Sequence, residues 1–276
     1  MTTDVPQDRV VDALEEEWRT LDELMAGLSE DEWATPTPLP GWTVKDVMAH
    51  AIGTESMLLG EAAPEIDVGA PEHVRNDIGR FNEQWVASMR DRSPADVLTE
   101  FRRVTSRRLE ALRAMDTDTW EAEGFTPAGK DSYGRFMRIR VFDCWIHEQD
   151  IRDAVGRPGG DAGAPAELAL DEMTTAMGFV VGKKAGASPG SRVMFDLIGP
   201  ASRQVLVELG TGEGARAAVV DELSGPPTVR LRMPVGVFVR LGGGRADPAS
   251  LRAQVEITGE DGELGERLVA NLAFTI

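Results

Sequence analysis

The chain has 276 residues, of which 42% are hydrophobic, enough apolar mass for one large domain or two of ordinary size. Acidic residues number 47 against 29 basic ones, and the formal net charge of −18 argues against nucleic-acid partners. The only cysteine, Cys144, excludes a disulfide framework and favours a reducing, cytoplasmic setting. The N-terminus turns acidic where a secretory signal needs an apolar run, and no apolar window is long enough to span a membrane. We therefore expect no membrane partner.

The first half of the chain has the apolar spacing of helices. Helices are expected over 7–28, from Val44 onward, over 72–91, over 94–115 and from Tyr133 to Val155. The start at Val44 is predicted because Thr43 and Asp46 have the spacing of a capping box. Three prolines and a glycine lie in the segment 29–42, which is predicted to be a connecting loop.

A Gly/Pro run at 156–160 ends the last of these helices and is the predicted domain boundary. Beyond it, residues 165–182 still have helical spacing. Short β-rich runs follow at 193–199, 204–210, 217–221, 228–233 and 253–259, with apolar helical segments near 234–242 and 262–272. The fold class predicted is a two-domain α+β protein, with a helical domain over 1–156 and a smaller α+β domain over 162–276.

The helix over 136–155 carries two opposite polar stripes, and one of them must face inward. One stripe holds Arg138, Glu148, Gln149 and Arg152, and the other holds Arg140, Asp143, His147 and Asp150. Asp143 and His147 are four residues apart, so their side chains lie one above the other, as chelation of a metal requires. A third ligand is expected from a facing helix, where His50 lies beside the apolar stripe. Two imidazoles and one carboxylate would leave positions open for water or substrate.

A structural interpretation is equally consistent with this spacing. In it, Asp143 pairs with Arg140, His147 bonds Asp150, and His50 is a satisfied core histidine. Glu55, unusual on the apolar stripe of its helix, is either a further ligand, a general base or, as we favour, the partner of an arginine such as Arg140.

Two segments resemble the signatures of the mycothiol-dependent maleylpyruvate isomerase family, within the DinB-like helical bundles. They are LPGWTVKDVMAH at 39–50 and RVFDCWIHEQDIRDAVGRPGG at 140–160. The resemblance implies an up-and-down four-helix bundle that holds a divalent metal, usually zinc, through His50, Asp143 and His147. Asp143 departs from the family pattern, which has Glu there. The segments 238–248 and 255–276 are similar to the sterol-carrier-like domain that accompanies this bundle.

The resemblance also implies an actinobacterial enzyme that uses mycothiol as its thiol cofactor on a small electrophilic or cis-enoic acid. Arg245, preferred over Arg240 and Arg232, is expected to hold a substrate carboxylate, and Arg140 to receive an anionic substrate or fix a ligand. Cys144 is expected to be a small buried hydrophobe. The alternatives are a mycothiol S-transferase and a non-catalytic protein that binds an apolar ligand beside a vestigial metal site.

Overall fold

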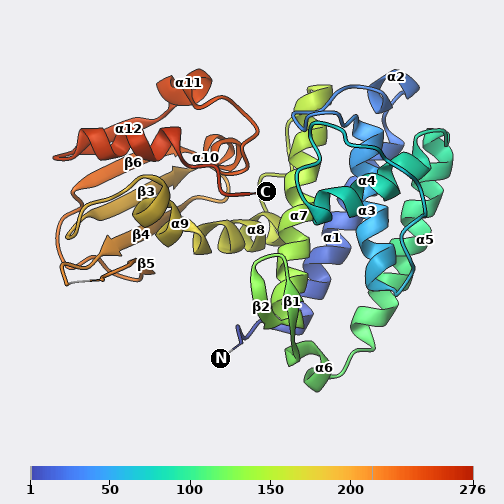
Figure 1. Cartoon of the computed structure of the whole chain (residues 1–276), viewed down its shortest axis with the longest axis horizontal. Helices are drawn as coiled ribbons and strands as arrows, with labels where there is room; N and C mark the ends of the chain where they lie inside the picture. The colour runs from blue at the N-terminus through green and yellow to red at the C-terminus, as the bar shows by residue number, and fades with distance from the viewer. Residues whose placement is uncertain (1, 213, 276) are drawn as a thin grey trace. The chain divides into compact units, whose positions relative to one another are not determined.

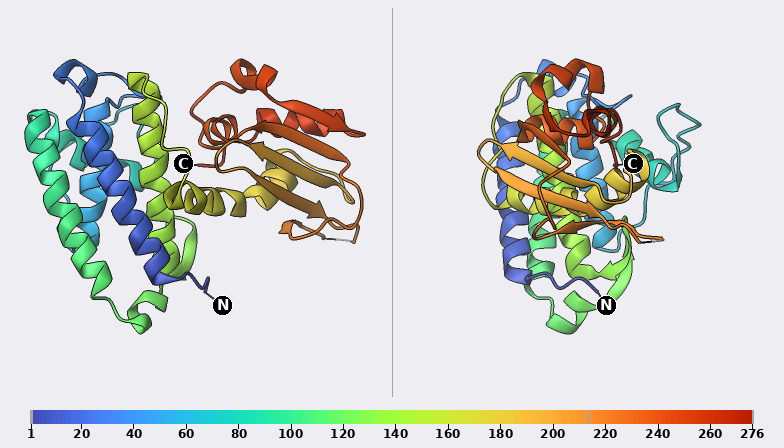
Figure 2. Two further views of the ribbon diagram at one scale, coloured as in Figure 1. Left: turned by 180° about the vertical axis from the view of Figure 1, so that it is seen from behind. Right: turned by 90° about the vertical axis from the view of Figure 1, so that its left-hand side faces the viewer.

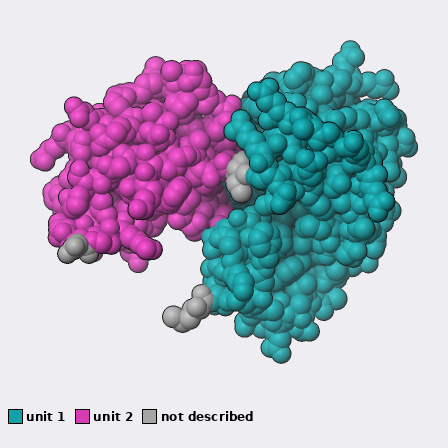
Figure 3. Space-filling view, viewed as in Figure 1, with its two compact units in different colours: residues 1–160 teal, residues 161–276 magenta. Residues whose placement is uncertain are grey.

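The chain divides into two compact units in the computed structural model, residues 1–160 and residues 161–276 (Figure 1, Figure 3). The structure describes residues 2–212 and 214–275. The first unit is mainly helical, and the second is built around a five-stranded sheet. The predicted α+β class, with helices first and a smaller sheet domain second, is therefore confirmed.

Four long helices form the core of the first unit, and each lies beside two of the others. They are α1 (Gln7–Ala26), α3 (Val44–Leu58), α5 (Pro94–Arg113) and α7 (Tyr133–Val155). Around the bundle their order is α1, α5, α3, α7. Most of the largest side chains buried in these helices are apolar, among them Leu14, Leu21, Met48, Ile52, Phe101 and Trp145, and Arg108 is a charged exception.

The direction of the helices differs from the simple alternation expected of an up-and-down bundle. Helices α1 and α7 run one way, and α3 and α5 run the other way (Figure 1). The reason is that residues 59–76 and α4 (Asp77–Met89) carry the chain back toward the end at which α3 begins. There, Lys45 Nζ donates to the carbonyl oxygens of Arg90 at 2.6 Å and Arg92 at 3.2 Å, just before α5 starts.

Local capping explains where these helices begin and end. Thr43 and Asp46 form the predicted capping box and start α3 at Val44. The predicted bounds of the last helix, Tyr133–Val155, are confirmed, and Gly156 ends it in the left-handed conformation with φ 65°. Asn76 caps α4, which therefore starts at Asp77 rather than at residue 72.

Three short pieces of the first unit were not predicted. A capping box at Ser29 and Glu32 forms α2 (Glu30–Trp33) ahead of the prolines in the expected loop. Helix α6 (Thr117–Glu121) and the antiparallel hairpin of β1 (Glu123–Thr126) and β2 (Gly129–Ser132) connect α5 to α7.

The sheet of the second unit has the strand order β5-β4-β3-β6-β7, and its neighbours are antiparallel except for β3 and β6. The strands are β3 (Arg192–Ile198), β4 (Arg203–Leu209), β5 (Ala217–Val220), β6 (Val229–Pro234) and β7 (Glu256–Gly259). Each of the five predicted β-rich runs overlaps one of these strands. Alternate residues of β3, Val193, Phe195 and Leu197, are buried.

Helices cover the buried face of this sheet (Figure 2). They are α8 (Ala164–Thr175), α9 (Met177–Phe179) with a π-helical turn (Val180–Lys184), α10 (Val235–Gly242) and α12 (Gly262–Ala270). Helix α11 (Pro248–Leu251) and a 3-10 turn (Arg252–Gln254), which have no buried residue, connect α10 to β7. Among the described residues, no helix combines the length and the apolar character that crossing a membrane requires.

Candidate metal centre

The three residues predicted to bind a metal lie together in the first unit. One ligand atom from each of His50, Asp143 and His147 lies within 4.8 Å of the other two. His50 Nε2 is 3.2 Å from Asp143 Oδ2, and His147 Nε2 is 3.7 Å from Asp143 Oδ1. The antiparallel contact of α3 with α7 produces this arrangement, because it places the middle of α3 opposite one turn of α7.

The site is buried but has one side toward solvent. The two imidazoles are 6% and 8% exposed for His50 and His147, whereas the Asp143 side chain is 29% exposed.

The protonation states of the site suit a cation. Burial lowers the pKa of His50, so its imidazole is neutral at pH 7 and keeps a lone pair for a ligand bond. Burial alone would raise the pKa of Asp143, but the charge of Arg140 and the contacts with His147 and His50 hold that pKa well below its usual range. Neutral imidazole and ionised carboxylate are the donors that zinc takes in catalytic sites, so the residues present fit a divalent metal.

A second carboxylate fixes the orientation of His147. Asp150 is 2% exposed, and its Oδ2 lies 3.0 Å from His147 Nδ1. This contact keeps the proton on Nδ1 and leaves Nε2 for the site, as in carboxylate–histidine–metal arrangements. Asp150 thus makes the contact with His147 that was expected from the sequence, and in the structure that contact supports the metal interpretation as much as the structural one.

A buried ion-pair network lies behind the site. Glu55 accepts from Arg140 Nε and from Arg108 Nε, both at 2.9 Å, and Arg140 Nη1 donates to Asp143 Oδ2. Glu55, Arg108 and Arg140 are each at most 3% exposed. Glu55 is therefore the partner of arginines, as favoured from the sequence, and Arg140 is occupied by carboxylates of the protein.

Cys144 lies on the same helix and is buried. Burial raises the pKa of its thiol, so it stays protonated and does not act as a nucleophile. This agrees with the expectation that it is a small buried hydrophobe.

Sequence reasoning missed Glu83, on α4. Its carboxylate is 1% exposed and accepts from Trp42 Nε1 at 3.0 Å and from Arg90 Nη2 at 2.6 Å, and it lies 3.0 Å from His73 Nε2. The available signal was an acid three residues before Val86 on an apolar helix face, at a position where a charge needs partners.

The arginines proposed for the substrate carboxylate lie in the second unit. Arg245 follows α10 in the Gly-rich turn, and its Nη1 donates to the Gly243 carbonyl at 2.7 Å. Arg232 is half exposed on β6, with its Nε 3.5 Å from Asp196 Oδ2. Arg240 lies in the last turn of α10.

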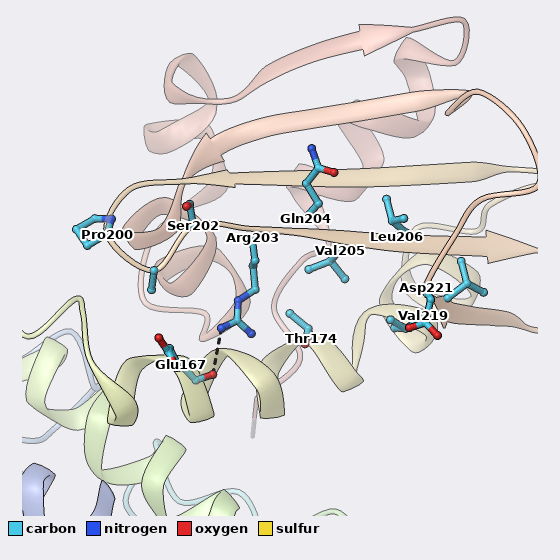
Figure 4. A pocket seen from close by; sticks show the side chains of 12 residues that line it. Glu167, Thr174, Pro200, Ser202, Arg203, Gln204, Val205, Leu206, Val219 and Asp221 are labelled. Atoms are coloured by element: carbon cyan, nitrogen blue, oxygen red, sulfur yellow. Dashed lines mark hydrogen bonds between the residues drawn. The ribbon is translucent and has the colours of Figure 1, made fainter. Parts of the chain in front are cut away.

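The second unit also has an open groove of about 470 Å³, shown in Figure 4. It lies between α8, the turn joining β3 to β4, and the end of β5. Arg203 crosses it and donates to the Glu167 carbonyl at 3.2 Å and to Asp171 Oδ1 at 2.7 Å. None of the three metal-site residues lines this groove, so its size does not mark the chemical centre.

Fold and site together define a two-unit α+β protein whose helical unit carries a His, Asp, His group suited to a divalent cation. Residues 14–152 match the family model described as the mycothiol maleylpyruvate isomerase N-terminal domain, and residues 167–266 match that of the corresponding C-terminal domain. The chain therefore belongs to the mycothiol maleylpyruvate isomerase family, as its sequence motifs predicted.

Similar proteins extend the comparison. The chain is 31% identical over 138 residues to uncharacterized proteins of two Mycobacterium tuberculosis strains, CDC 1551 / Oshkosh and ATCC 25618 / H37Rv. The match covers 49% of this chain and 52% of each relative, so the chain spans about half the length of the curated relatives it matches.

Solved structures similar to the chain share its fold. The crystal structure of the mycothiol-dependent maleylpyruvate isomerase has a TM-score of 0.58 at 18% identity, with 94% of this chain and 96% of that chain covered. A mutant of that isomerase gives a TM-score of 0.57 with the same identity and coverage. At 18% identity this likeness shows only that the fold is shared, and it extends over both units of the chain.

Proposed function

We propose that the chain is a mycothiol-dependent isomerase of a small cis-enoic acid similar to maleylpyruvate, and that it depends on a divalent metal, with zinc as the first candidate. The observation that carries this proposal is the convergence of His50 Nε2, His147 Nε2 and an Asp143 oxygen, each from a buried or half-buried side chain. Family membership supports the thiol and the reaction class.

The side chains around the site have separable tasks. His50, Asp143 and His147 would hold the ion, Asp150 keeps His147 in the ligating tautomer, and Arg140 keeps Asp143 ionised. A bound zinc ion would lower the pKa of a coordinated thiol, so that a thiolate is present at neutral pH. Because Cys144 is buried and protonated, the thiol must come from a co-substrate, which is the role we assign to mycothiol.

Such a thiol can isomerise the substrate without being consumed. Its sulfur adds to one carbon of the cis double bond while a proton adds to the other, the resulting single bond rotates, and elimination returns the thiol and the trans double bond. Arg245 is our proposed partner of a substrate carboxylate, because guanidinium matches carboxylate geometry in a bidentate manner. We assign the contacts of Arg140 to positioning Asp143 rather than to the substrate. A cytoplasmic location fits both the single cysteine and a low-molecular-weight thiol.

Metal content is the first test. Purified protein should contain about one equivalent of a divalent metal, and its removal should lower thermal stability, since an ion that binds only the folded state stabilises it. Metal below about a tenth of an equivalent, with no stabilisation on adding zinc, nickel, iron or manganese, would contradict the proposal.

Turnover is the second test. Metal-loaded protein, mycothiol and maleylpyruvate should give the trans isomer with no loss of thiol. Consumption of thiol, with maleylpyruvate or with a panel of electrophiles, would instead identify an S-transferase. A metal-free protein without turnover would leave the non-catalytic ligand-binding alternative.

A further inference from the structure

Trp42 packs against both histidines of the candidate metal centre. Its ring centroid lies 5.3 Å from that of His50 and 6.4 Å from that of His147, with tilts of 38° and 43°. The two imidazoles are 5.0 Å apart and nearly perpendicular, at 80°. The three rings therefore form one packed group, and the indole limits how both imidazoles can turn.

The two histidines differ in what else orients them. Asp150 holds His147 at Nδ1, but the buried Nδ1 of His50 has no hydrogen-bond partner among the described residues. Metal-ligating histidines are usually oriented by a hydrogen bond at the second ring nitrogen. For His50, ring packing must take over that task, and Trp42 is its aromatic neighbour besides His147.

The indole is itself fixed by a charged group. Trp42 Nε1 donates at 3.0 Å to Glu83, whose buried carboxylate also accepts from Arg90 and lies 3.0 Å from His73 Nε2. Burial would raise the pKa of Glu83, but these contacts lower it, so the acceptor is ionised. Hydrogen bonds to an ionised acceptor are stronger than neutral ones, and this one sets the rotation of the indole.

Gly41, directly before Trp42, makes room for this arrangement. Its φ is +80°, and a Cβ there would lie 2.6 Å from His73 Nδ1 and 2.7 Å from His73 Cε1. The end of the predicted connecting loop, residues 41 and 42, thus fits against His73 from the 59–76 connection on one side and against the candidate metal ligands on the other.

We propose that Trp42 is a positioning residue, which Glu83 locks in place so that it holds the His50 and His147 imidazoles ready for a divalent metal. This inference rests on the proposed metal function and adds the residues that orient the candidate ligands. None of Trp42, Glu83 and His73 is offered as a ligand. Their effect should therefore appear as a change in metal affinity and in the geometry of the bound ion.

Cobalt(II) titration of the full chain tests this, since the visible absorption of bound cobalt reports its coordination. Trp42→Leu and Glu83→Gln should each weaken cobalt binding by about 10-fold or more and alter the absorption spectrum. Trp42→Phe keeps an aromatic ring but loses the indole N–H, and a smaller loss is expected. Glu83→Gln and Trp42→Phe keep the proposal testable if Trp42→Leu does not fold.

The matched control is Trp120→Phe. Trp120 is buried in the same unit and its Nε1 donates to the Val5 carbonyl at 2.7 Å, so this variant loses a comparable hydrogen bond away from the three ligands. Its cobalt affinity and spectrum should equal those of the wild type even if its thermal stability falls.

The outcomes separate the two proposals. If the wild type binds cobalt and Trp42→Leu and Glu83→Gln bind it with the same affinity and spectrum, the positioning role is overturned while the metal function stands. If the wild type binds no cobalt or zinc, the metal function fails first, and the positioning role fails with it.

Discussion

The short side chain of Asp143 contacts both the two histidines and Arg140. Its Oδ2 lies beside both His50 Nε2 and the Arg140 guanidinium, and its Oδ1 faces His147. Arg140 is in turn balanced by Glu55. A guanidinium therefore keeps the Asp143 carboxylate ionised and offsets part of the desolvation cost of burying it.

Replacing that charge tests the ligand assignment. Asp143→Asn removes the anionic donor and leaves Arg140 with one carboxylate fewer, so the affinity for zinc should fall by about 100-fold or more. Isothermal titration calorimetry with zinc measures it. Asp153→Asn, an exposed change of the same kind on the same helix, should leave the affinity unchanged. Equal affinity in Asp143→Asn and wild type would remove Asp143 from the ligand set.

A second buried acid has a different task. Glu17 on α1 is 1% exposed and hydrogen-bonds the buried Glu148 carboxylate of α7, which Arg152 holds at 2.6 Å. Burial and the charge of Glu148 raise the pKa of Glu17 well above its usual range. Glu17 is therefore a proton donor between two helices rather than a charge.

The pH dependence of the protein's stability follows from the raised pKa of Glu17. A raised pKa gives stability that is fully present below the ordinary Glu value of about 4.3 and is lost as the pH rises through the folded-state pKa. Glu17→Gln keeps a donor to Glu148 without a titrating proton, so it should raise Tm by about 2–4 °C at pH 8 and by less at pH 5. Thermal unfolding at the two pH values measures this, with the exposed change Glu121→Gln as control. A larger gain at pH 5 than at pH 8 would contradict the assignment.

At the scale of the elements, local signals predicted more than long-range ones. The capping box at Thr43 and the glycine at 156 determine where α3 begins and α7 ends, and both are written in a few adjacent residues. The order of the helices around the bundle cannot be predicted from adjacent residues, because it depends on contacts such as that of Glu55 with Arg108, 53 positions apart.

The same distinction applies to the site. The i, i+4 spacing of Asp143 and His147 predicted a shared face, and the position of His50 beside the apolar stripe of another helix predicted the third ligand, in agreement with the motif resemblance. Glu83 could not be found in this way, because its partners Trp42 and His73 come from two separate connections that only the folded chain brings together.

Close packing of α3 on α4 gives a prediction about these elements. A Cβ on Gly53 would lie 2.3 Å from Trp85 Cγ and 2.5 Å from Trp85 Cβ, so the helices approach through that glycine. Gly53→Ala should destabilise the protein by about 1–3 kcal/mol through overpacking, although alanine favours helix. Chemical denaturation measures the loss. Gly124→Ala, where the added Cβ meets nothing within 4 Å, is the control, and equal stabilities would show that α4 yields at this contact.

At the scale of the whole molecule, each unit has a core of its own. Phe101, Met137 and Trp145 are buried in the first, and Phe195 and Phe238 in the second. The first unit contains all three proposed metal ligands and also Trp42 and Glu83. A ligand that binds only the folded form of one unit stabilises that unit against unfolding.

Metal should therefore stabilise the chain unevenly. At zinc concentrations near 100 times Kd, the first unit should gain about 2.7 kcal/mol of stability against unfolding. Hydrogen exchange followed by mass spectrometry should show slower exchange in α3 and α7, which carry the proposed ligands, and little change in the strands β3, β4 and β6. His50→Ala should abolish the protection, because His50 is the one proposed ligand that α3 contributes. Equal protection of both units, or protection that persists in His50→Ala, would mean that the ion stabilises the chain through groups other than these three.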